Sequence, residues 1–362
     1  MDDVPRFLFI PVSGPGGAGE YFRTLAVARG LERRWPGCSI KFVVSRDATY
    51  SQGGPYPALL LDRSPTFEAA AVARILEQER PHVVVFDSAG CLSQYLAAQR
   101  VGARVVYVSS RPSTRRKGFR LRRLLATDQF WIAQPRFLGG ELTLRERWKR
   151  KLAPHLEVLF LEVLHEPVDE EGTRSLQQRL GVQPGGYLLA CPGGGGIFGD
   201  GRDAAQVFFG AASRVARETA VPVVAVPGLR FLAPANPPPG LHLVPSLPNG
   251  QLMGMLRDAR VGMVNGGSLL LQAMAQQSPC VAAPVADDQP RRIARAVACG
   301  YARSAVLDAA ALAGAAAELL GADAEREALR GRLARLGLRN GVDIAAGAVG
   351  RLLPAAPAGE AR

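Results

Sequence analysis

Short, almost continuously apolar runs recur along the chain and are separated by longer segments with helical spacing. In the first half these runs are residues 7–12, 40–44, 58–61, 83–86 and 105–108. In the second half they are residues 187–191, 221–226, 241–244, 261–264 and 281–283. Runs of this length without polar alternation are typical of strands that are buried on both faces of a sheet.

The intervening segments carry apolar residues at three- and four-residue spacing, as in 21–34, 66–80 and 204–219. Alternating strands and helices predict parallel sheets joined by right-handed crossovers. Because there are two such series, we expect an α/β protein with two Rossmann-like domains. A polar segment between them, 165–184, reads as a linker followed by the first helix of the second domain. The predicted parts are an N-terminal domain at 1–166, a C-terminal domain at 167–340, and a segment at 341–362 that forms a helix able to pack back on the N-terminal domain, followed by a disordered tail.

Composition narrows the class of protein. The chain has 362 residues, of which 48% are hydrophobic, enough for two cores and too many for general disorder. No apolar run reaches the roughly 18 residues of a membrane-spanning helix, and the acidic N-terminus does not read as a secretory signal. The five cysteines lack C-x-x-C spacing, so we expect a cytoplasmic protein without a disulfide framework or zinc site.

Three glycine-rich turns each follow a predicted strand. They read SGPGGAGE at 13–20, PGGGG at 192–196 and NGGS at 265–268. Ligands of parallel sheets bind at the carboxyl ends of the strands, where backbone N–H groups and helix N-termini suit phosphate groups. None of the turns has the spacing for NAD or a P-loop, so those two functions are not expected. The plain alternative is that they are only tight strand-to-helix turns.

The stretch 241–302 resembles the donor-nucleotide half of GT-B glycosyltransferases. The elements that carry the resemblance are, in order, Leu247-Pro248 in a loop, Gly266-Gly267 before a helix, Ser278-Pro279 before a short strand, and Asp288-Gln289. The most similar group contains the peptidoglycan N-acetylglucosaminyl transferase and related UDP-sugar enzymes. The first glycine turn and the following 25–28 are similar to the acceptor-side loop of this family, and 87–90 and 105–111 stand where the family keeps its other acceptor loops. The resemblance implies two Rossmann-like domains facing across a cleft.

The resemblance also implies roles for residues of the C-terminal domain. Leu247 would present backbone to the base, the glycine turns would hold the diphosphate, and Asp288 with Gln289 would contact sugar hydroxyls. Gln272 stands where the family usually has a ribose-binding Glu, so a charge-assisted hydrogen bond would be lost there; otherwise it is an exposed helix residue. The expected donor-binding residues are Gly193, Gly194, Gly195, Gly196, Leu247, Gly266, Gly267, Ser268, Gln272, Asp288 and Gln289. The expected acceptor-side residues are Gly16, Gly17, Gly19, Ser88, Ser109 and Arg111.

The catalytic base is the point at which this chain departs from the family. The family usually has a His just after the first glycine turn, whereas this chain has Glu20 there and its four histidines lie elsewhere. A carboxylate can act as a general base when burial raises its pKa toward the working pH. We expect Glu20 or Asp87 to be the base. The alternative is that neither acts so, with Glu20 stabilising the positive end of a helix. Because no D-x-D motif occurs, we expect no metal, and no cofactor other than the donor substrate.

The net charge of +12 is concentrated in one segment. Residues 104–151 contain 14 basic and three acidic residues, so this segment alone carries +11. Basic residues interleaved with apolar and aromatic ones fit an anionic membrane surface or an acceptor phosphate, and otherwise form an ordinary solvated face. Without a stacking platform, nucleic acid is not expected. The expected anion-binding patch comprises Arg115, Arg116, Lys117, Arg120, Arg122, Arg123, Arg147, Lys149, Arg150 and Lys151.

Together these features indicate an inverting glycosyltransferase, acting in the cytoplasm or peripherally on the inner face of a membrane. It would move a sugar from a nucleotide diphosphate donor, UDP-linked by resemblance, to a hydroxyl of a lipid-linked, phosphorylated or other small acceptor. The alternatives are a nucleotide-sugar hydrolase or epimerase on the same fold, and a non-catalytic binding subunit. The sequence leaves the choice between monomer and dimer open.

Overall fold

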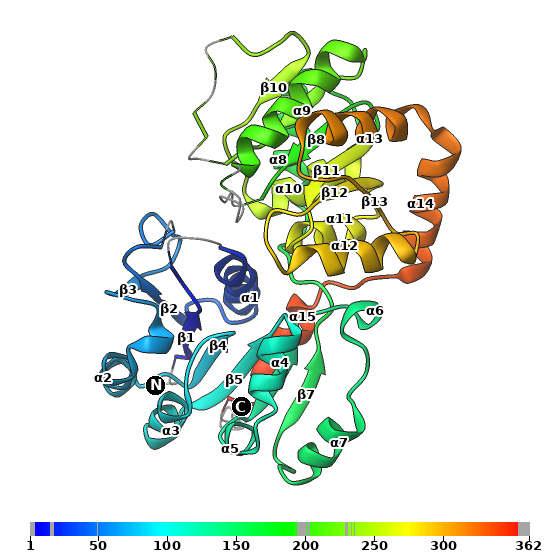
Figure 1. Cartoon of the computed structure of the whole chain (residues 1–362). Helices are drawn as coiled ribbons and strands as arrows, with labels where there is room; N and C mark the ends of the chain where they lie inside the picture. The colour runs from blue at the N-terminus through cyan, green and yellow to red at the C-terminus, as the bar shows by residue number, and fades with distance from the viewer. Residues whose placement is uncertain are drawn as a thin grey trace, which may run out of the picture. The chain divides into compact units, whose positions relative to one another are not determined.

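The computed structural model describes residues 4–14, 18–48, 50–193, 201, 203–228, 231–232, 234 and 236–353. The chain forms two compact units, each an α/β unit built on its own parallel sheet (Figure 1). The first unit extends to Leu164 and resumes at Asn340, whereas the second comprises His165–Arg339. The expected α/β class with two Rossmann-like domains is therefore confirmed.

The sheet of the first unit has seven parallel strands in the order β3-β2-β1-β4-β5-β6-β7. The strands are β1 (Arg6–Pro11), β2 (Ser39–Ser45), β3 (Ala58–Leu61), β4 (Val83–Asp87), β5 (Arg104–Ser109), β6 (Gln129–Ile132) and β7 (Glu157–Phe160). The helices are α1 (Gly19–Arg34), η1 (Pro65–Phe67), α2 (Ala69–Glu79), α3 (Leu92–Arg100), α4 (Pro112–Gly118), α5 (Leu121–Leu124), α6 (Arg136–Gly139), α7 (Leu144–Lys151) and α15 (Val342–Gly350).

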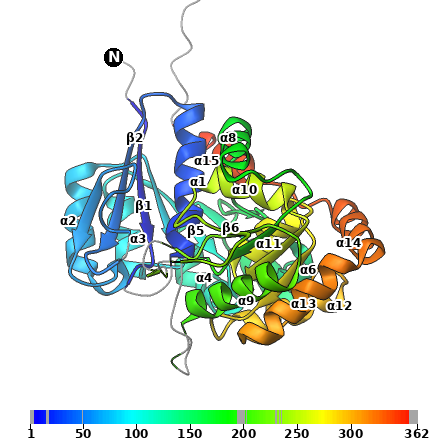
Figure 2. The ribbon, with the colours of Figure 1, turned by 90° about the horizontal axis from the view of Figure 1, so that it is seen from above.

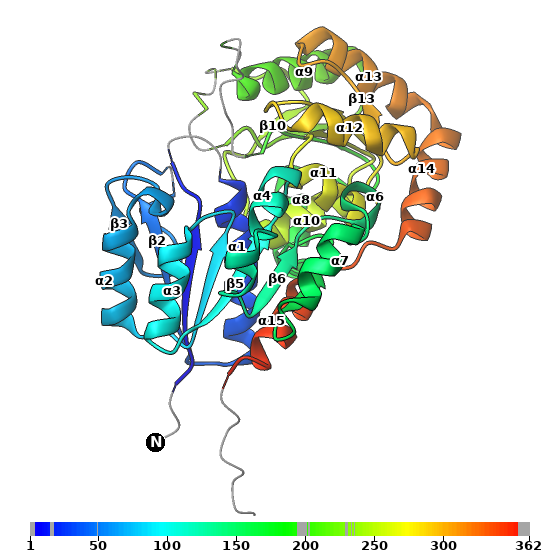
Figure 3. The ribbon, with the colours of Figure 1, turned by 60° about the horizontal axis from the view of Figure 1, so that its bottom comes forward.

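Each face of this sheet has its own hydrophobic core. Alternate strand residues such as Phe9 and Val85 pack against α1 and α15, which lie against each other (Figure 2). Their neighbours in sequence, such as Ile10 and Phe86, pack on the opposite face, which α2 and α3 cover side by side (Figure 3). Because both faces are covered, the carboxyl ends of the strands are where loops can present side chains to a ligand.

The second unit has six parallel strands in the order β10-β9-β8-β11-β12-β13. The strands are β8 (Leu188–Cys191), β9 (Val223–Ala225), β10 (Leu241–Leu243), β11 (Val261–Asn265), β12 (Cys280–Ala283) and β13 (Arg303–Ser304). The helices are α8 (Glu170–Leu180), α9 (Ala204–Glu218), α10 (Asn249–Asp258), α11 (Ser268–Ala275), α12 (Gln289–Ala298), α13 (Ala309–Gly321) and α14 (Asp323–Leu336). Helices α9 and α13 pack together on one face of the sheet, over Met263 and Val281.

All ten predicted runs contain a strand, and three strands were missed. β6 and β7 each begin with a polar residue, Gln129 or Glu157, so that only three apolar residues follow within each strand. β13 is a two-residue strand whose Arg303 and Ser304 carry no apolar signal. Among the residues that the structure describes, no helix has both the length and the hydropathy needed to cross a membrane.

Candidate functional site

Three predicted residues of the first unit come together at the carboxyl ends of adjacent strands. Glu20 lies in the first turn of α1, Asp87 ends β4, and Arg111 follows β5. The Arg111 guanidinium donates a hydrogen bond to Glu20 Oε1. Arg23, one turn along α1, donates from Nε and Nη2 to the two carboxylate oxygens of Asp87, each at 2.7 Å. Arg23 Nη2 also lies 4.0 Å from Glu20 Oε1, so the four charged residues form one network.

The Arg23–Asp87 pair is the buried centre of this network. Asp87 has no exposed surface, and its Oδ1 accepts a further hydrogen bond from Ser88 Oγ at 3.2 Å. Burial raises the pKa of Asp87 to about 6, against the opposing effect of Arg23. Ser88 itself has a φ of 57°, a left-handed conformation that is uncommon for a residue other than glycine. Both oxygens of Asp87 are therefore occupied, while Glu20 is engaged by guanidinium groups through Oε1.

Tyr50 is a residue of this region that the sequence did not single out. Its ring stacks on that of Tyr21, with centroids 4.1 Å apart and an angle of 13° between the planes. Its hydroxyl is buried and has no hydrogen-bond partner among the described residues. Burial, followed by the negative charge of Glu20, raises the pKa of Tyr50. A buried hydroxyl without a partner is costly, so it marks a place where a ligand group could supply one.

The other acceptor-side predictions have mixed outcomes. Ser109 is buried, and its Oγ lies 3.0 Å from Thr114 Oγ1 and donates to the Arg111 carbonyl at 3.3 Å, so it fixes the start of α4. Gly19 is the first residue of α1. Gly16 and Gly17 lie outside the described residues.

In the second unit, two glycine turns follow the adjacent strands β8 and β11, and Asn265 joins them. Its Nδ2 donates to the Pro192 carbonyl at 2.5 Å, and its Oδ1 accepts from the Gly267 backbone N–H at 2.7 Å. Gly193 has a φ of 82°, and a Cβ there would collide with Asn265 Nδ2. The turn thus needs both a glycine and an amide. The predicted Gly194, Gly195 and Gly196 lie outside the described residues.

Gln289 supports the same turn from the start of α12. Its buried Oε1 accepts from the backbone N–H groups of Gly266 at 3.1 Å and Val285 at 2.8 Å. Asp288, exposed beside it, accepts from Arg292 Nη2 at 3.1 Å. Arg292 also donates from Nη1 to the Gly266 carbonyl at 2.6 Å, which places a guanidinium at the glycine turn. The i,i+4 spacing of Asp288 and Arg292 is the sequence signal that could have identified this arginine.

The remaining predicted donor residues lie on or near α10 and α11. Ser268 is the exposed first residue of α11, and no side chain caps this helix at Gly267. Its first backbone N–H groups therefore have no side-chain acceptor within the helix cap, as an anion site at a helix N-terminus requires. Gln272 follows one turn later and is half-buried, and Leu247 is half-buried in the loop before α10.

Two of the ten predicted patch residues are not at the surface. The buried Arg115 donates to both oxygens of Glu146 at 2.9 and 2.8 Å, and to the Gly139 carbonyl at 2.6 Å. The buried Arg123 donates to the Gly90 carbonyl at 3.2 Å and packs over the Tyr95 ring. These two arginines hold the fold together, and we remove them from the anion-binding patch.

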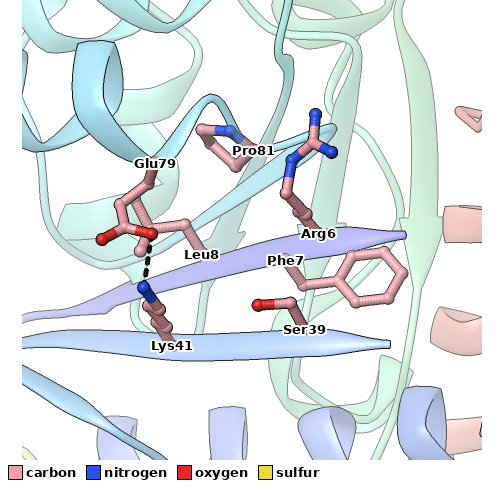
Figure 4. Close-up of a pocket in the computed structure, with 7 residues that line it drawn as sticks. All are labelled: Arg6, Phe7, Leu8, Ser39, Lys41, Glu79 and Pro81. Carbon is pink, nitrogen blue, oxygen red and sulfur yellow. Dashed lines mark hydrogen bonds and ion pairs between the residues drawn. The ribbon is translucent and has the colours of Figure 1, made fainter. Parts of the chain in front are cut away.

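Two hollows in the first unit lie at the opposite, amino-terminal ends of the strands. The smaller, between Arg6, Lys41 and Glu79, is crossed by the Lys41–Glu79 ion pair at 2.6 Å (Figure 4). Its volume of about 10 Å³ is near the minimum for one water molecule. The larger has a volume of about 300 Å³, and its charged residues include the pairs Arg104–Asp128 and Arg351–Glu157. Neither hollow contains a predicted site residue. Within the described ranges, no cluster of three metal-ligating side chains occurs.

Solved structures with this architecture place the fold among glycosyltransferases. The chain is similar to a spinosyn forosaminyltransferase, with a TM-score of 0.66 and 15% identity over 97% of this chain and 100% of the other. It is also similar to a UDP-glucose:anthocyanidin 3-O-glucosyltransferase solved in complex with UDP, with a TM-score of 0.60 and 11% identity over 97% and 99%. The fold is GT-B.

This fold also serves other sugar-nucleotide chemistry. A protein assigned as a UDP-N-acetylglucosamine 2-epimerase, from Listeria monocytogenes, has a TM-score of 0.61 and 13% identity over 96% of this chain and 95% of the other. No protein-family model and no curated protein matches the sequence. The likeness is thus one of fold, and it does not single out the peptidoglycan transferase group that the sequence resembles.

Proposed function

We propose that this protein is a glycosyltransferase that moves a sugar from a nucleotide diphosphate donor to an acceptor hydroxyl. The observation that carries the proposal is the pair of turns at β8 and β11, joined by Asn265 and flanked by Arg292. Backbone N–H groups at an uncapped helix start, next to a guanidinium, are suited to the two phosphates of a leaving diphosphate. The solved neighbour that holds UDP supports a UDP-linked donor.

Glu20 is the better of the two proposed bases. Both oxygens of Asp87 accept hydrogen bonds from the buried Arg23, which leaves Asp87 in a positioning role. Glu20 is bound at one oxygen by Arg111, and its other oxygen has no hydrogen-bond partner among the described residues. In the proposed step Glu20 takes the proton of the acceptor hydroxyl, and the acceptor oxygen bonds to the anomeric carbon. The bond from that carbon to the diphosphate breaks, and its electron pair leaves with the diphosphate, which inverts the anomeric configuration.

The donor half of the proposal is tested by binding. We expect UDP or a UDP-sugar to raise the melting temperature in a screen that also contains GDP, TDP and their sugars. The variant Arg292→Ala should lose most of this shift, whereas Arg295→Ala, on the same helix, should retain it. If no nucleotide changes the melting temperature, the donor site is wrongly assigned.

The catalytic half is tested by Glu20→Gln, which keeps the shape of the side chain and removes its basicity. Removing a general base typically lowers turnover by about 10²–10⁴-fold. We expect such a loss in kcat with little change in UDP binding, and a product of inverted configuration by NMR. Glu32→Gln, on the same helix, is the matched control. Equal turnover in the Glu20→Gln and Glu32→Gln variants would remove Glu20 from the mechanism.

Two other functions are distinguishable in the same assays. The epimerase neighbour makes a donor-directed reaction the second candidate, which would interconvert or hydrolyse a UDP-sugar without any acceptor. A binding subunit would take up UDP but turn over no donor, and Glu20→Gln would then have no effect. Incubation with UDP-N-acetylglucosamine alone, followed by NMR, separates these outcomes from glycosyl transfer.

A further inference from the structure

Helix α7 is a surface helix whose apolar side chains are exposed to solvent. None of its residues is buried. Leu144, Trp148 and Leu152 are 81%, 61% and 43% exposed, and their four-residue spacing places them in one stripe. Leu121 of α5 and Leu125, which directly follows this helix, are also exposed. An amphipathic surface helix normally turns such a stripe toward the core, so a stripe that faces solvent indicates a surface that something else covers.

The helix is held firmly in this orientation by its polar residues. Glu146, on the opposite side of α7 from the stripe, accepts two hydrogen bonds from the buried Arg115 of α4. Lys149 donates to the Phe119 carbonyl at 3.0 Å, which ties α7 to the residues just before α5. Thr143 and Glu146 form a reciprocal cap at the start of the helix. The exposed stripe is therefore a built feature of the first unit.

The positive charge of segment 104–151 is not neutralised by the rest of the described chain. The three acidic residues of 104–151 are each paired with an arginine of the same segment: Asp128 with Arg104, Glu141 with Arg136, and Glu146 with Arg115. Arg111 pairs with Glu20, and Arg123 is buried. Nine cations remain that form no ion pair with any described residue. They are Arg116, Lys117, Arg120, Arg122, Arg145, Arg147, Lys149, Arg150 and Lys151.

The crowding of these cations is itself unfavourable. Burial, followed by the positive charges of Arg123 and Arg120, lowers the pKa of Lys117. Concentrated like charge destabilises the folded chain unless a partner of opposite charge compensates it. An anionic partner would compensate this charge, and the same partner would have to accept the exposed leucine and tryptophan side chains.

We propose that the exposed side chains of α4, α5 and α7 dock on an anionic lipid bilayer. A bilayer meets both requirements, because its headgroups can pair with exposed cations such as Arg116, Arg122 and Arg150, and its acyl boundary accepts the Leu144–Trp148–Leu152 stripe. Nucleic acid would match the charge but offers no apolar layer for three side chains in a row along one helix. The inference goes beyond the proposed function and does not depend on it. If the two hold together, the acceptor is one presented at a membrane.

The charge requirement is tested by sedimentation with phosphatidylcholine vesicles that contain or lack phosphatidylglycerol. Each basic residue near such a surface contributes about 1 kcal/mol, or roughly fivefold in partition. The triple variant Arg116→Ser/Arg120→Ser/Arg122→Ser should therefore bind about a hundredfold less. Arg214→Ser/Arg217→Ser/Arg335→Ser, at exposed positions of the second unit, changes the net charge equally and should bind normally. Binding should also weaken as salt is added.

The apolar requirement is tested by the fluorescence of Trp148. The chain has three tryptophans, and Trp131 is fully buried while Trp35 is half-buried. We expect anionic vesicles to shift the fluorescence emission of the wild-type protein to shorter wavelength as Trp148 enters the bilayer. This shift should be absent in Trp148→Phe. Leu144→Ser/Trp148→Ser should reduce vesicle binding at least tenfold, whereas Phe67→Ser/Val306→Ser, at two other exposed apolar positions, should not.

Several outcomes would overturn the proposal. Equal binding to neutral and anionic vesicles would exclude the charge pairing, and an unshifted Trp148 spectrum in the wild-type protein would exclude insertion. Tight binding to a DNA duplex without vesicle binding would assign the cations to nucleic acid. The wild-type fluorescence result decides between these outcomes even if a variant folds poorly. Since UDP is absent from all these measurements, failure of docking leaves donor binding untouched, and the reverse also holds.

Discussion

The turns at the carboxyl ends of the two sheets are held in different ways. In the first unit, charged side chains hold the turns: Arg23 binds Asp87 and Arg111 binds Glu20. In the second unit, the amides of Asn265 and Gln289 bond to backbone groups of the glycine turns, and one guanidinium, that of Arg292, donates to the Gly266 carbonyl. Both arrangements fix loops after buried parallel strands, but the first uses buried carboxylates paired with arginines, whereas the second uses amides and one arginine, without a buried carboxylate.

The different side chains at the two sets of turns suit the groups that each is proposed to bind, a diphosphate in the second unit and an acceptor hydroxyl in the first. A diphosphate brings its own negative charge, so a carboxylate in that turn would repel it, while an amide can fix the backbone without adding charge. An acceptor hydroxyl is neutral and must lose a proton, which requires a carboxylate close by. Burying that carboxylate among others requires cations beside it, and Arg23 and Arg111 supply them.

The charged network should be the more sensitive of the two to removal of one member. Asp87→Ala would leave the fully buried Arg23 guanidinium without its partner, which typically costs about 3–5 kcal/mol. We expect a loss of this size in the free energy of unfolding, measured by urea denaturation. Glu141→Ala, which breaks the exposed Arg136–Glu141 pair, should cost about 1 kcal/mol or less. Equal losses would mean that the buried pair is no more important than a surface one.

The turn that Asn265 holds should be sensitive to the introduction of a negative charge. Asn265→Asp keeps the oxygen that accepts from Gly267 but removes the donor to Pro192, at a cost of about 1–3 kcal/mol. The new negative charge should also lower the affinity for UDP about tenfold or more, as measured by calorimetry. Asn249→Asp, elsewhere in the same unit, is the control. An unchanged affinity in Asn265→Asp would place the diphosphate somewhere else.

A methyl group added at the close-packed Gly266 should destabilise the protein less than Asp87→Ala does. A Cβ on Gly266 would lie 2.5 Å from Ile293 Cδ1 and 3.0 Å from Gln289 Cβ. Gly266→Ala should therefore destabilise the second unit by about 1–3 kcal/mol. Gly314→Ala, inside α13 with no atom within 4 Å of the new Cβ, should instead stabilise it by about 0.5–1 kcal/mol. Thermal melts of the two variants should move in opposite directions.

The smallest expected effect is on the pH dependence of stability, to which Asp87 of the first unit and His165 of the second unit contribute with opposite signs. Burial lowers the pKa of His165 in the second unit, so the unfolded chain binds its proton more readily, and stability is lost as the pH falls below about 6.5. Asp87 changes the free energy of unfolding in the opposite direction. Because its pKa is raised, the folded chain takes up a proton at a higher pH than the unfolded chain, so stability increases as the pH falls through about 6. Urea melts across this range should show a steeper acid stabilisation in His165→Gln than in the wild type. An identical slope would mean that His165 does not titrate differently on folding.

The strands and their order in the chain could be predicted because both sheets are buried on two faces. Continuous apolar runs such as 83–86 and 261–264 are too short for a buried helix and lack the alternation of a half-exposed strand. The edge strand β7 was missed although 158–161 is as apolar as the correctly predicted run 58–61, because a four-residue run beside Glu157 and Glu162 is a weak signal. The return of α15 to the first unit was anticipated only as a possibility of the fold, because its Ala-rich sequence contains nothing that identifies its partner.

The site was harder to predict, because side-chain contacts join residues far apart in the sequence. Glu20, Asp87 and Arg111 were selected separately, but nothing in the sequence indicated that Arg23 would bind Asp87, 64 residues away. Similarly, the basic residues all looked alike in the sequence. In the structure, Arg115 and Arg123 differ from the neighbouring basic residues in being buried, where their hydrogen bonds stabilise the first unit.

The path of the chain has a consequence for how the protein is made. Residues of α15, among them Val342, Ala345 and Val349, belong to the core that α1 covers, yet the whole second unit precedes them in the sequence. During synthesis the second unit, a single continuous segment, can finish folding first. The first unit meanwhile has all its strands, but one face of its sheet is covered by α1 without α15. A ribosome that stalls before residue 342 would release a chain with an exposed apolar surface, which is the kind of substrate that chaperones and proteases recognise.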